Sequence, residues 1–453
     1  MTLFSRLKLS TIALSGMLIT GCFDGGSKGV IKHEIESPAI DHGQDHDHTV
    51  ESKGRLVLLN QDKSEAHVFD LDQRKILESF TLSTSSVALQ TSAGGRYALL
   101  SDRQNDVVSF IDGGLWQENH DDHQHSYAQT PAFSDFELHG FAPTHITYSD
   151  ENTIVFNDGN AATGANASIQ IIDDTSIANR RIKATLNFEI NMHGVAKLQQ
   201  NTLFATVRRG DDESTSNAKI LPDQIGVYEL HEDHFHFDSV LDITCPDLHG
   251  AAQNHEAVAF ACRDGVVITH SHDGHFESDK ITNIEAIADL RIGTLFGHHG
   301  SNTFLGTASN RATGEVNILT ITPDESEMAL LDWQPVSNAQ PISYAFNVDG
   351  TQFLILDNQG YLTVVDAHQH DGHAHWTFKQ RIDVSKADIS TLSEDQRFGL
   401  VVSKRENTAY VTDSAASTIL VVNITTGEIE DTIALTFTPS SMTWLGIPEG
   451  DQH

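Results

Sequence analysis

The chain has 453 residues, with 28 Lys and Arg against 63 Asp and Glu, so its formal net charge is −35. A surface this acidic repels phosphate backbones, which excludes nucleic acid as a natural partner and favours cations. Hydrophobic residues make up 39% of the chain, enough for a core and too few for a protein with many membrane spans. There are also 26 His, many of them clustered.

Residues 1–21 are predicted to be an export signal, because Arg6 and Lys8 precede an apolar stretch too short to cross a membrane as a helix. The stretch ends in Ile19-Thr20-Gly21-Cys22, which resembles the bacterial lipobox, so Cys22 is the expected lipidation site. The alternative is an ordinary cleaved signal with an incidental Cys. We therefore expect a lipid-anchored protein in the periplasm. The outer membrane is favoured over the inner because Phe23 stands where inner-membrane lipoproteins often carry Asp.

Residues 22–53 are polar, rich in Gly, His and Asp, and without apolar periodicity, so they are expected to form a flexible tether. The tether carries His42, His46 and His48 among several Asp residues. This composition favours secondary capture of a metal ion, although a tract with no specific role is the alternative. Residues 54–453 form the folded part.

From residue 54 onward, short apolar runs alternate with Asp, Asn, Gly and Ser turns and recur roughly every 40–60 residues, a pattern typical of an all-β fold, the β-propeller. The inner strands are predicted to start near positions 86, 145, 193, 249, 298, 342, 398 and 441. Strand-like residues at the N-terminus, from Arg55 on, have no inner strand before them, and Ser441–Leu445 has no strands after it. Pairing these two ends would close the ring, which predicts eight blades, with seven as the alternative.

Several histidines fall at the predicted starts of four consecutive inner strands: His145, His193, His249 and the pair His298-His299. Radial symmetry would bring them to one mouth of the central channel, and three or four imidazoles around one point are typical of a Zn²⁺ site. The predicted ligands are His145, His193, His249 and His299. The alternative is that these rings are structural and form hydrogen bonds with neighbouring blades.

A longer insertion in the second blade contains His120, His123 and His125, and it is the candidate lid that would bring His123 and His125 to the ion. Other histidines alternate along predicted hairpin turns, where weak metal capture and solvated loop tips are both possible. These are His231, His234, His236, His270, His272, His275, His368, His370, His373 and His375.

Cys245 and Cys262 are 17 positions apart in a chain expected to be exported, which predicts a disulfide; a two-thiol metal site is the alternative. The segment Cys245-Pro246-Asp247-Leu248-His249-Gly250, the second Cys and the His-rich tether resemble the AztD-type zinc metallochaperones. The resemblance implies a periplasmic propeller that is not an enzyme. It would bind Zn(II) and pass it to the solute-binding protein of a zinc ABC importer. A lipid anchor at Cys22 departs from the soluble members.

Two other functions are compatible with the sequence. A metal with an open coordination position could activate water in a lactonase-like propeller enzyme. Alternatively, the chain could be an adhesion or surface propeller whose His-rich turns are incidental. We expect a monomer.

Overall fold

The computed structural model describes residues 50–449, apart from 121–122, 209–220, 273–274, 371–372, 386–391 and 393–395. The predicted signal, Cys22 and the tether residues His42, His46 and His48 lie outside the described residues. No helix in the described part of the chain is long and apolar enough to cross a membrane.

The described strands belong to one compact unit, in which most strands form four-stranded antiparallel sheets. Six such sheets consist of β1 (Arg55–Asn60), β2 (Glu65–Asp70), β3 (Lys75–Thr81) and β34 (Pro439–Leu445); β4 (Val87–Thr91), β5 (Tyr97–Asp102), β6 (Val107–Asp112) and β9 (Ala132–His139); β18 (Ala251–Gln253), β19 (Ala257–Cys262), β20 (Gly265–His272) and β21 (His275–Thr282); β22 (Arg291–Phe296), β23 (Phe304–Asn310), β24 (Glu315–Thr322) and β25 (Glu327–Leu330); β26 (Pro341–Phe346), β27 (Gln352–Asp357), β28 (Tyr361–His370) and β29 (His373–Asp383); β30 (Gly399–Val402), β31 (Thr408–Asp413), β32 (Thr418–Asn423) and β33 (Ile429–Ala434).

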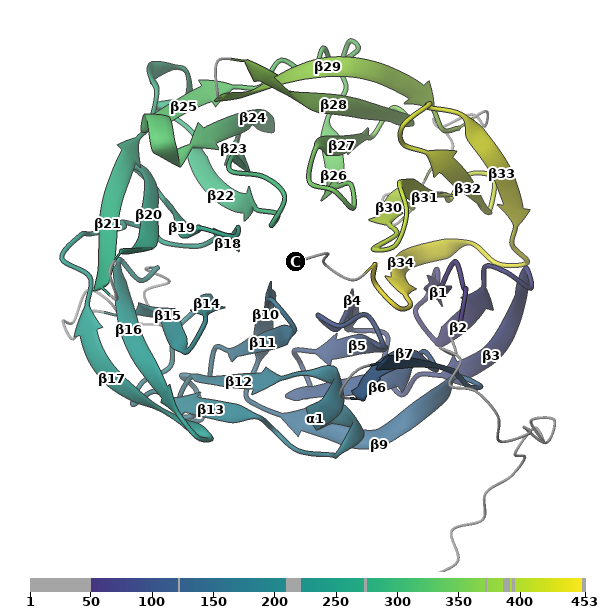
Figure 1. Cartoon of the computed structure of the whole chain (residues 1–453), viewed down its shortest axis with the longest axis horizontal. Helices are drawn as coiled ribbons and strands as arrows, with labels where there is room; N and C mark the ends of the chain where they lie inside the picture. Colours follow the sequence, from purple (N-terminus) through teal and green to yellow (C-terminus); the bar gives the residue numbers. More distant parts are fainter. Residues whose placement is uncertain are drawn as a thin grey trace, which may run out of the picture. The chain divides into compact units, whose positions relative to one another are not determined.

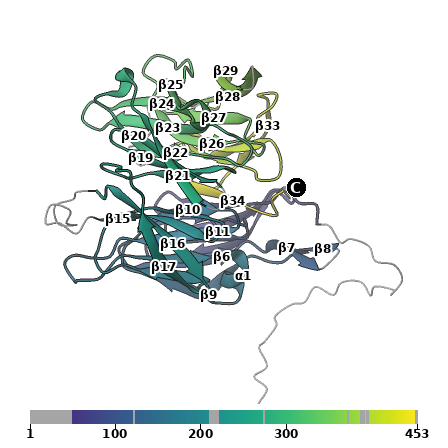
Figure 2. The same ribbon diagram turned by 60° about the vertical axis from the view of Figure 1, so that its left-hand side comes forward.

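An eight-stranded sheet contains two further runs of four strands, joined only by a parallel pair between Thr185 and His234. Its strands are β10 (Pro143–Ser149), β11 (Asn152–Asn157), β12 (Ser168–Ile172), β13 (Ala184–Asn187), β14 (Ala196–Gln199), β15 (Thr202–Val207), β16 (Gln224–His231) and β17 (His234–Val240). A separate hairpin, β7 (Leu115–His120) and β8 (His123–Ala128), projects from the second sheet (Figure 2). The short helices are α1 (Asp174–Ala178), η2 (Glu285–Ile287) and η3 (Pro323–Glu325).

Figure 1 shows the sheets set around a central axis, which confirms the predicted all-β propeller. The innermost strands are β4, β10, β14, β18, β22, β26, β30 and β34. The sheets pack face to face, so neighbouring residues on one strand enter different cores. Leu56 and Leu58 pack with residues of β31 and β32, whereas Val57 and Leu59 pack with residues of β5. Because both faces are covered, the central strands are continuous apolar runs. The number of blades stays a prediction.

The two ends of the chain complete one sheet. β1 pairs antiparallel with β34, with Leu56 opposite Trp444 and Leu58 opposite Met442, and it pairs on its other side with β2. Leu56–Leu59 are fully buried in this position. Closure by the terminal strands is therefore confirmed, and it protects sheet edges that would otherwise remain open.

Candidate metal centre

Three predicted ligands come together at one end of three consecutive inner strands. His145 is the third residue of β10, His193 lies three residues before β14, and His249 lies two residues before β18. The ring centroids are 4.7 Å apart for His145 and His193 and 5.2 Å apart for each pair that includes His249. One potential ligand atom of each ring lies within 4.8 Å of the other two. The geometry has the size of a site for one metal ion.

Each of these rings has its Nδ1 next to an oxygen acceptor. The Nδ1 of His145 lies 2.8 Å from the carbonyl of Gly194, that of His249 lies 3.0 Å from the carbonyl of Gly293, and that of His193 lies 2.9 Å from Oδ2 of Asp158. Carbonyl and carboxylate oxygens only accept hydrogen bonds, so the proton of each neutral ring belongs on Nδ1. The three Nε2 lone pairs are thereby free for a metal. Outer oxygen partners of this kind orient metal-binding imidazoles and raise their basicity.

Close approach of neighbouring sheets makes two of these hydrogen bonds possible. Gly194 directly follows His193, and a Cβ at this position would collide with the hydroxyl of Thr206 and the ring of Phe156. A glycine therefore lets the segment before β14 lie against β10, where its carbonyl accepts from His145. The carbonyl of Gly293, on β22, accepts from His249 in the same way, but this position does not require a glycine, because a Cβ there would meet nothing within 4 Å.

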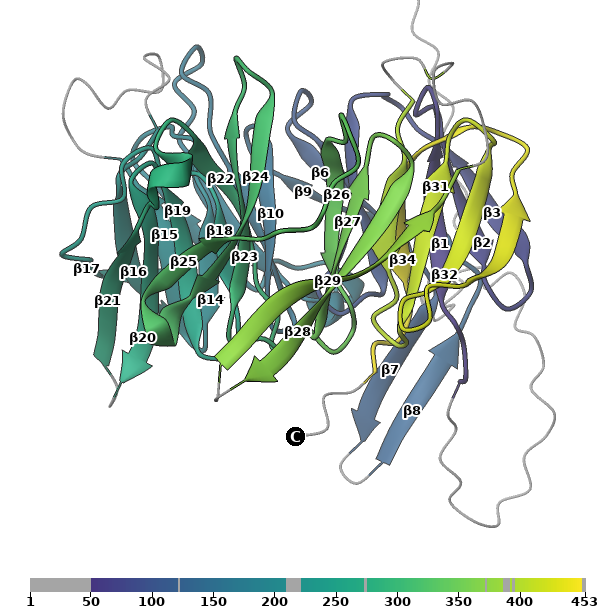
Figure 3. The ribbon, with the colours of Figure 1, turned by 90° about the horizontal axis from the view of Figure 1, so that it is seen from above.

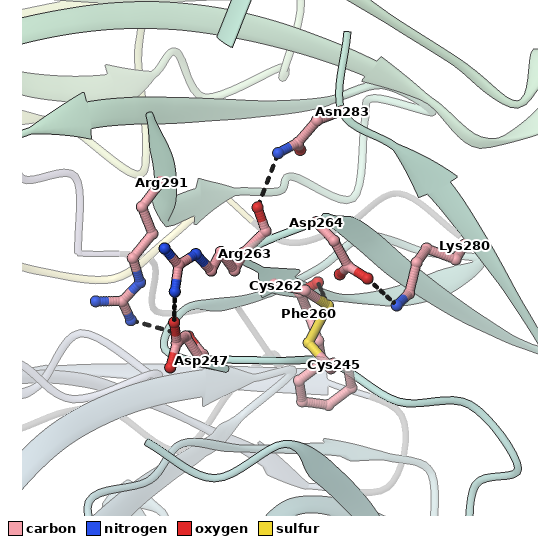
Figure 4. The surroundings of a disulfide bond; sticks show 9 residues. All are labelled: Cys245, Asp247, Phe260, Cys262, Arg263, Asp264, Lys280, Asn283 and Arg291. Carbon is pink, nitrogen blue, oxygen red and sulfur yellow. Dashed lines mark hydrogen bonds and ion pairs between the residues drawn. A yellow bond between two sulfur atoms is a disulfide. The ribbon is translucent and has the colours of Figure 1, made fainter. Parts of the chain in front are cut away.

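The segment that carries His249 is held by a disulfide between Cys245 and Cys262 (Figure 4). Backbone hydrogen bonds hold the same segment, from the N–H of Leu248 to the carbonyl of Pro222 and from the N–H of Arg263 to that of Pro246. The guanidinium of Arg291 donates to the carbonyl of Asp247 at 2.9 Å. The predicted disulfide is confirmed, and the alternative of a two-thiol metal site is wrong.

Burial keeps two of the three cluster rings in the form that binds metals. It lowers the pKa of His145 below the ordinary value, and the adjacent His193 ring lowers that pKa further. Burial also lowers the pKa of His249 to about 4. Both rings are therefore neutral at neutral pH. Three imidazole nitrogens with one coordination position left open are a ligand set suited to Zn²⁺.

Two groups around the cluster were not predicted as parts of the site. Asp158, which accepts from His193, also pairs with Nη2 of Arg103 at 3.0 Å. The sequence does contain a signal for Asp158, because this residue directly follows β11. The last residue of β11, Asn157, pairs with Pro143 at the start of β10, which places Asp158 at the end of the sheet where His145 lies. Nothing in the local sequence marks Arg103, which reaches Asp158 from the turn after β5.

His299 does not join the cluster, which corrects the predicted register. The inner strand of that sheet, β22, begins at Arg291 and ends at Phe296, so His298 and His299 follow its far end instead of its start. The Nε2 of His299 lies 3.5 Å from Oδ1 of Asp150, which directly follows the end of β10. Ile292, the residue before Gly293, occupies the position that His193 and His249 take before their own glycines.

The predicted lid also lies elsewhere. β6 begins at Val107, which pairs with Asp102, the residue beside the start of the inner strand β4. It ends at Asp112, at the other end of the sheet. The β7–β8 hairpin continues from that other end, away from the end where inner strands begin, so His125 is not brought to the cluster. His123 pairs with His120 across the hairpin, and its side chain lies outside the described part.

The fold and the cluster define a β-propeller protein with a three-histidine centre. No family model matches the chain. The chain is 23% identical over 405 residues to the protein named Zinc chaperone AztD of Citrobacter koseri, with 86% of each chain covered. The crystal structure of Citrobacter koseri AztD superposes with a TM-score of 0.68 at 21% identity, covering 88% of this chain and 99% of that one. The resemblance predicted from the sequence is confirmed.

A further solved structure is similar in fold alone. Dihydro-heme d1 dehydrogenase NirN matches with a TM-score of 0.53 at 10% identity, over 88% of this chain and 77% of that one.

Proposed function

We propose that this chain is a zinc metallochaperone that binds Zn²⁺ through the Nε2 atoms of His145, His193 and His249. The observation that carries the proposal is the convergence of three rings whose Nδ1 atoms all face oxygen acceptors. Such rings present the Nε2 lone pairs that tetrahedral Zn²⁺ takes at about 2.0–2.1 Å. The similar Citrobacter protein is named a zinc chaperone, which supports the same metal and the same non-enzymatic role.

The composition of the centre suits transfer better than permanent storage. Three neutral nitrogen ligands leave the ion its full charge and one open position, through which a ligand of another protein can enter before the first ligands leave. The His193 side chain is 28% exposed, so the cluster is reachable from solvent. The acceptor we propose is the solute-binding protein of a zinc ABC importer.

The setting we propose is the periplasm, with Cys22 as the lipid anchor and the outer membrane as the favoured membrane. His42, His46 and His48 on the tether would act in secondary capture. A formal net charge of −35 would concentrate cations around the folded part.

Competition with a chelator tests the binding step. Single changes His145→Ala, His193→Ala and His249→Ala should each weaken Zn²⁺ binding at least about 100-fold, because each removes one of only three protein ligands. His299→Ala is the matched control, since it removes an imidazole that lies beside Asp150 and outside the cluster, and it should leave the affinity unchanged. Unchanged affinity in the three cluster variants would overturn the proposed site.

A second experiment tests delivery. Zinc-loaded protein is mixed with the candidate solute-binding protein in the presence of a chelator that traps free ions. Direct transfer predicts that the acceptor fills faster than the chelator captures zinc from the loaded protein alone. Filling only at the rate of spontaneous release would contradict the chaperone function while leaving the zinc site intact.

A further inference from the structure

Four hairpins of this chain share one arrangement of histidines. In each, two His flank a two-residue turn, and the positions two residues further out on both strands hold His or Glu. The segments are Glu118–His125, Glu229–His236, His270–Glu277 and His368–His375. Three of them contain three His and one Glu, and the fourth contains four His.

Strand pairing brings the four positions of each hairpin into two adjacent cross-strand pairs. In β16–β17, His231 is opposite His234 and Glu229 is opposite His236. The same register occurs in β7–β8, β20–β21 and β28–β29. Alternate residues of a strand share one face, so in β16–β17 the two pairs form a patch of four potential ligands on one side of the ladder.

The side chains of the β16–β17 hairpin are in contact with one another. The His236 ring lies 4.6 Å from that of His231 and 4.9 Å from that of His234, measured between centroids. The Nε2 atoms of His234 and His236 are only 3.0 Å apart, and Oε2 of Glu229 lies 3.7 Å from Nε2 of His231. The side chains of His231 and His234 are each 54% exposed, so the patch is open to ions in solution.

The proton positions in this patch favour replacement by a metal. The Nδ1 of His234 lies 3.1 Å from Oδ1 of Asp233. A carboxylate oxygen only accepts hydrogen bonds, so the single proton of a neutral His234 ring belongs on Nδ1. The Nε2 of His234 therefore carries a lone pair, and the contact with His236 is a hydrogen bond donated by the Nε2–H of His236. Moving that proton to the other nitrogen of His236 places two lone pairs at a separation close to that of two ligands on one Zn²⁺ ion.

We propose that the β16–β17 hairpin is a second type of Zn²⁺ site, with His231, His234, His236 and Glu229 as ligands. Rotation of the exposed His231 and Glu229 side chains completes the set, so binding is weaker than at the central cluster.

This site is separate from the central cluster and does not depend on its function. In the sheet that contains β16 and β17, Thr202 follows the end of β14 and pairs with Glu229, so the hairpin turn lies at the end of the sheet away from His193. Figure 3 shows β7–β8, β20–β21 and β28–β29 extending toward the same side of the ring. The chain therefore offers zinc ligands on both faces of the propeller.

Zinc stoichiometry tests the proposal without involving the central cluster. The background is the full chain with His145→Ala, His193→Ala and His249→Ala, in which equilibrium dialysis counts bound Zn²⁺ at micromolar concentrations. Adding His231→Ala, His234→Ala and His236→Ala should remove one bound ion per chain. Adding His139→Ala should remove none, because His139 is an exposed imidazole beside Glu137 but lies outside the four-residue pattern. An unchanged count in the hairpin variant would overturn the proposal.

Two further measurements separate a formed site from nonspecific binding to imidazoles. Glu229→Gln keeps all three rings and should weaken zinc binding at the hairpin by about 3- to 10-fold, because it removes a charged oxygen ligand. In an NMR titration, Zn²⁺ should shift the ring protons of His231, His234 and His236 before those of His139. Equal shifts at all exposed histidines would contradict the proposal, even if the central cluster binds zinc as proposed above.

Discussion

His193 and Arg103 donate to the same carboxylate oxygen. The Nδ1 of His193 lies 2.9 Å from Oδ2 of Asp158, and Nη2 of Arg103 lies 3.0 Å from that atom. The Asp158 side chain is only 9% exposed, so its charge is balanced by protein groups more than by water. One carboxylate thus orients a predicted zinc ligand and connects it to a cation on another sheet.

Asp158→Asn should weaken Zn²⁺ binding by about 10- to 100-fold, the usual effect of losing an outer partner of a metal ligand. An amide can turn its NH₂ toward Nδ1 of His193, which favours the tautomer whose proton occupies Nε2, the atom needed for zinc. The measurement is chelator competition at constant pH. Asp150→Asn is the matched control, because Asp150 faces His299 at the other end of β10. Equal affinity in Asp158→Asn and wild type would show that the carboxylate does not support the centre.

The zinc-free protein should lose stability as the pH falls from about 6.5 toward about 4. The pKa of His249 is lowered from 6.5 to about 4 in the folded state, and that of His145 is lowered too. Between these pH values His145 and His249 bind protons in the unfolded chain but remain largely unprotonated in the folded chain. Protonation therefore favours unfolding.

Comparison with His249→Ala isolates this effect. Urea unfolding of both zinc-free proteins at pH 7 and pH 4 should show that the wild type loses about 1–2 kcal/mol more than the variant, after allowance for the solvent that still reaches the ring. An equal loss of unfolding free energy in the two proteins would mean that burial of His249 does not lower its pKa.

Much of the fold could be predicted because the physical signals are local. Apolar runs ending in Asp or Asn mark the strands, and unpaired runs at both chain ends predict the closure by β1 and β34. His193 and His249 could be placed because each stands next to a glycine at the start of an inner strand. The same local pattern gave a wrong position for His298-His299. This pair is flanked by Gly297 and Gly300 but follows the end of β22 instead of preceding its start.

Apart from Asp158, the outer partners of the cluster were beyond sequence reasoning for a physical reason. Every residue has a backbone carbonyl, so nothing in the sequence shows that those of Gly194 and Gly293 accept from imidazoles. The contact between Arg103 and Asp158 depends on how closely two sheets pack, which is a tertiary property.

Removal of the disulfide should affect both stability and zinc binding. The bond joins two residues 17 positions apart. A loop of this size stabilises the fold by about 3 kcal/mol, because the bond restricts the conformations of the unfolded chain. Cys245→Ala with Cys262→Ala should lower the free energy of unfolding by about this amount. It should also weaken zinc binding severalfold, because His249 follows Cys245 by four residues. Urea unfolding and chelator competition measure the two effects. Cys22→Ser keeps the disulfide and should match the wild type in both; a double variant as stable as the wild type would contradict the expected role.

Gly194→Ala and Gly293→Ala form a matched pair that tests whether close sheet packing builds the metal centre. Both glycines present a carbonyl to a cluster imidazole, at 2.8 Å for His145 and 3.0 Å for His249. A Cβ on Gly194 would meet Thr206 and Phe156, whereas a Cβ on Gly293 would meet nothing within 4 Å.

We expect Gly194→Ala to cost about 1–3 kcal/mol of stability, as overpacking does, and to weaken zinc binding because the shifted carbonyl no longer accepts from His145. Gly293→Ala should leave both quantities close to those of the wild type, since its carbonyl stays in place. Thermal or urea unfolding and chelator competition on the two variants give the comparison. If Gly194→Ala lowered stability and left zinc affinity intact, the hydrogen bond from His145 to Gly194 would be dispensable, and orientation of the ring would have to come from packing alone.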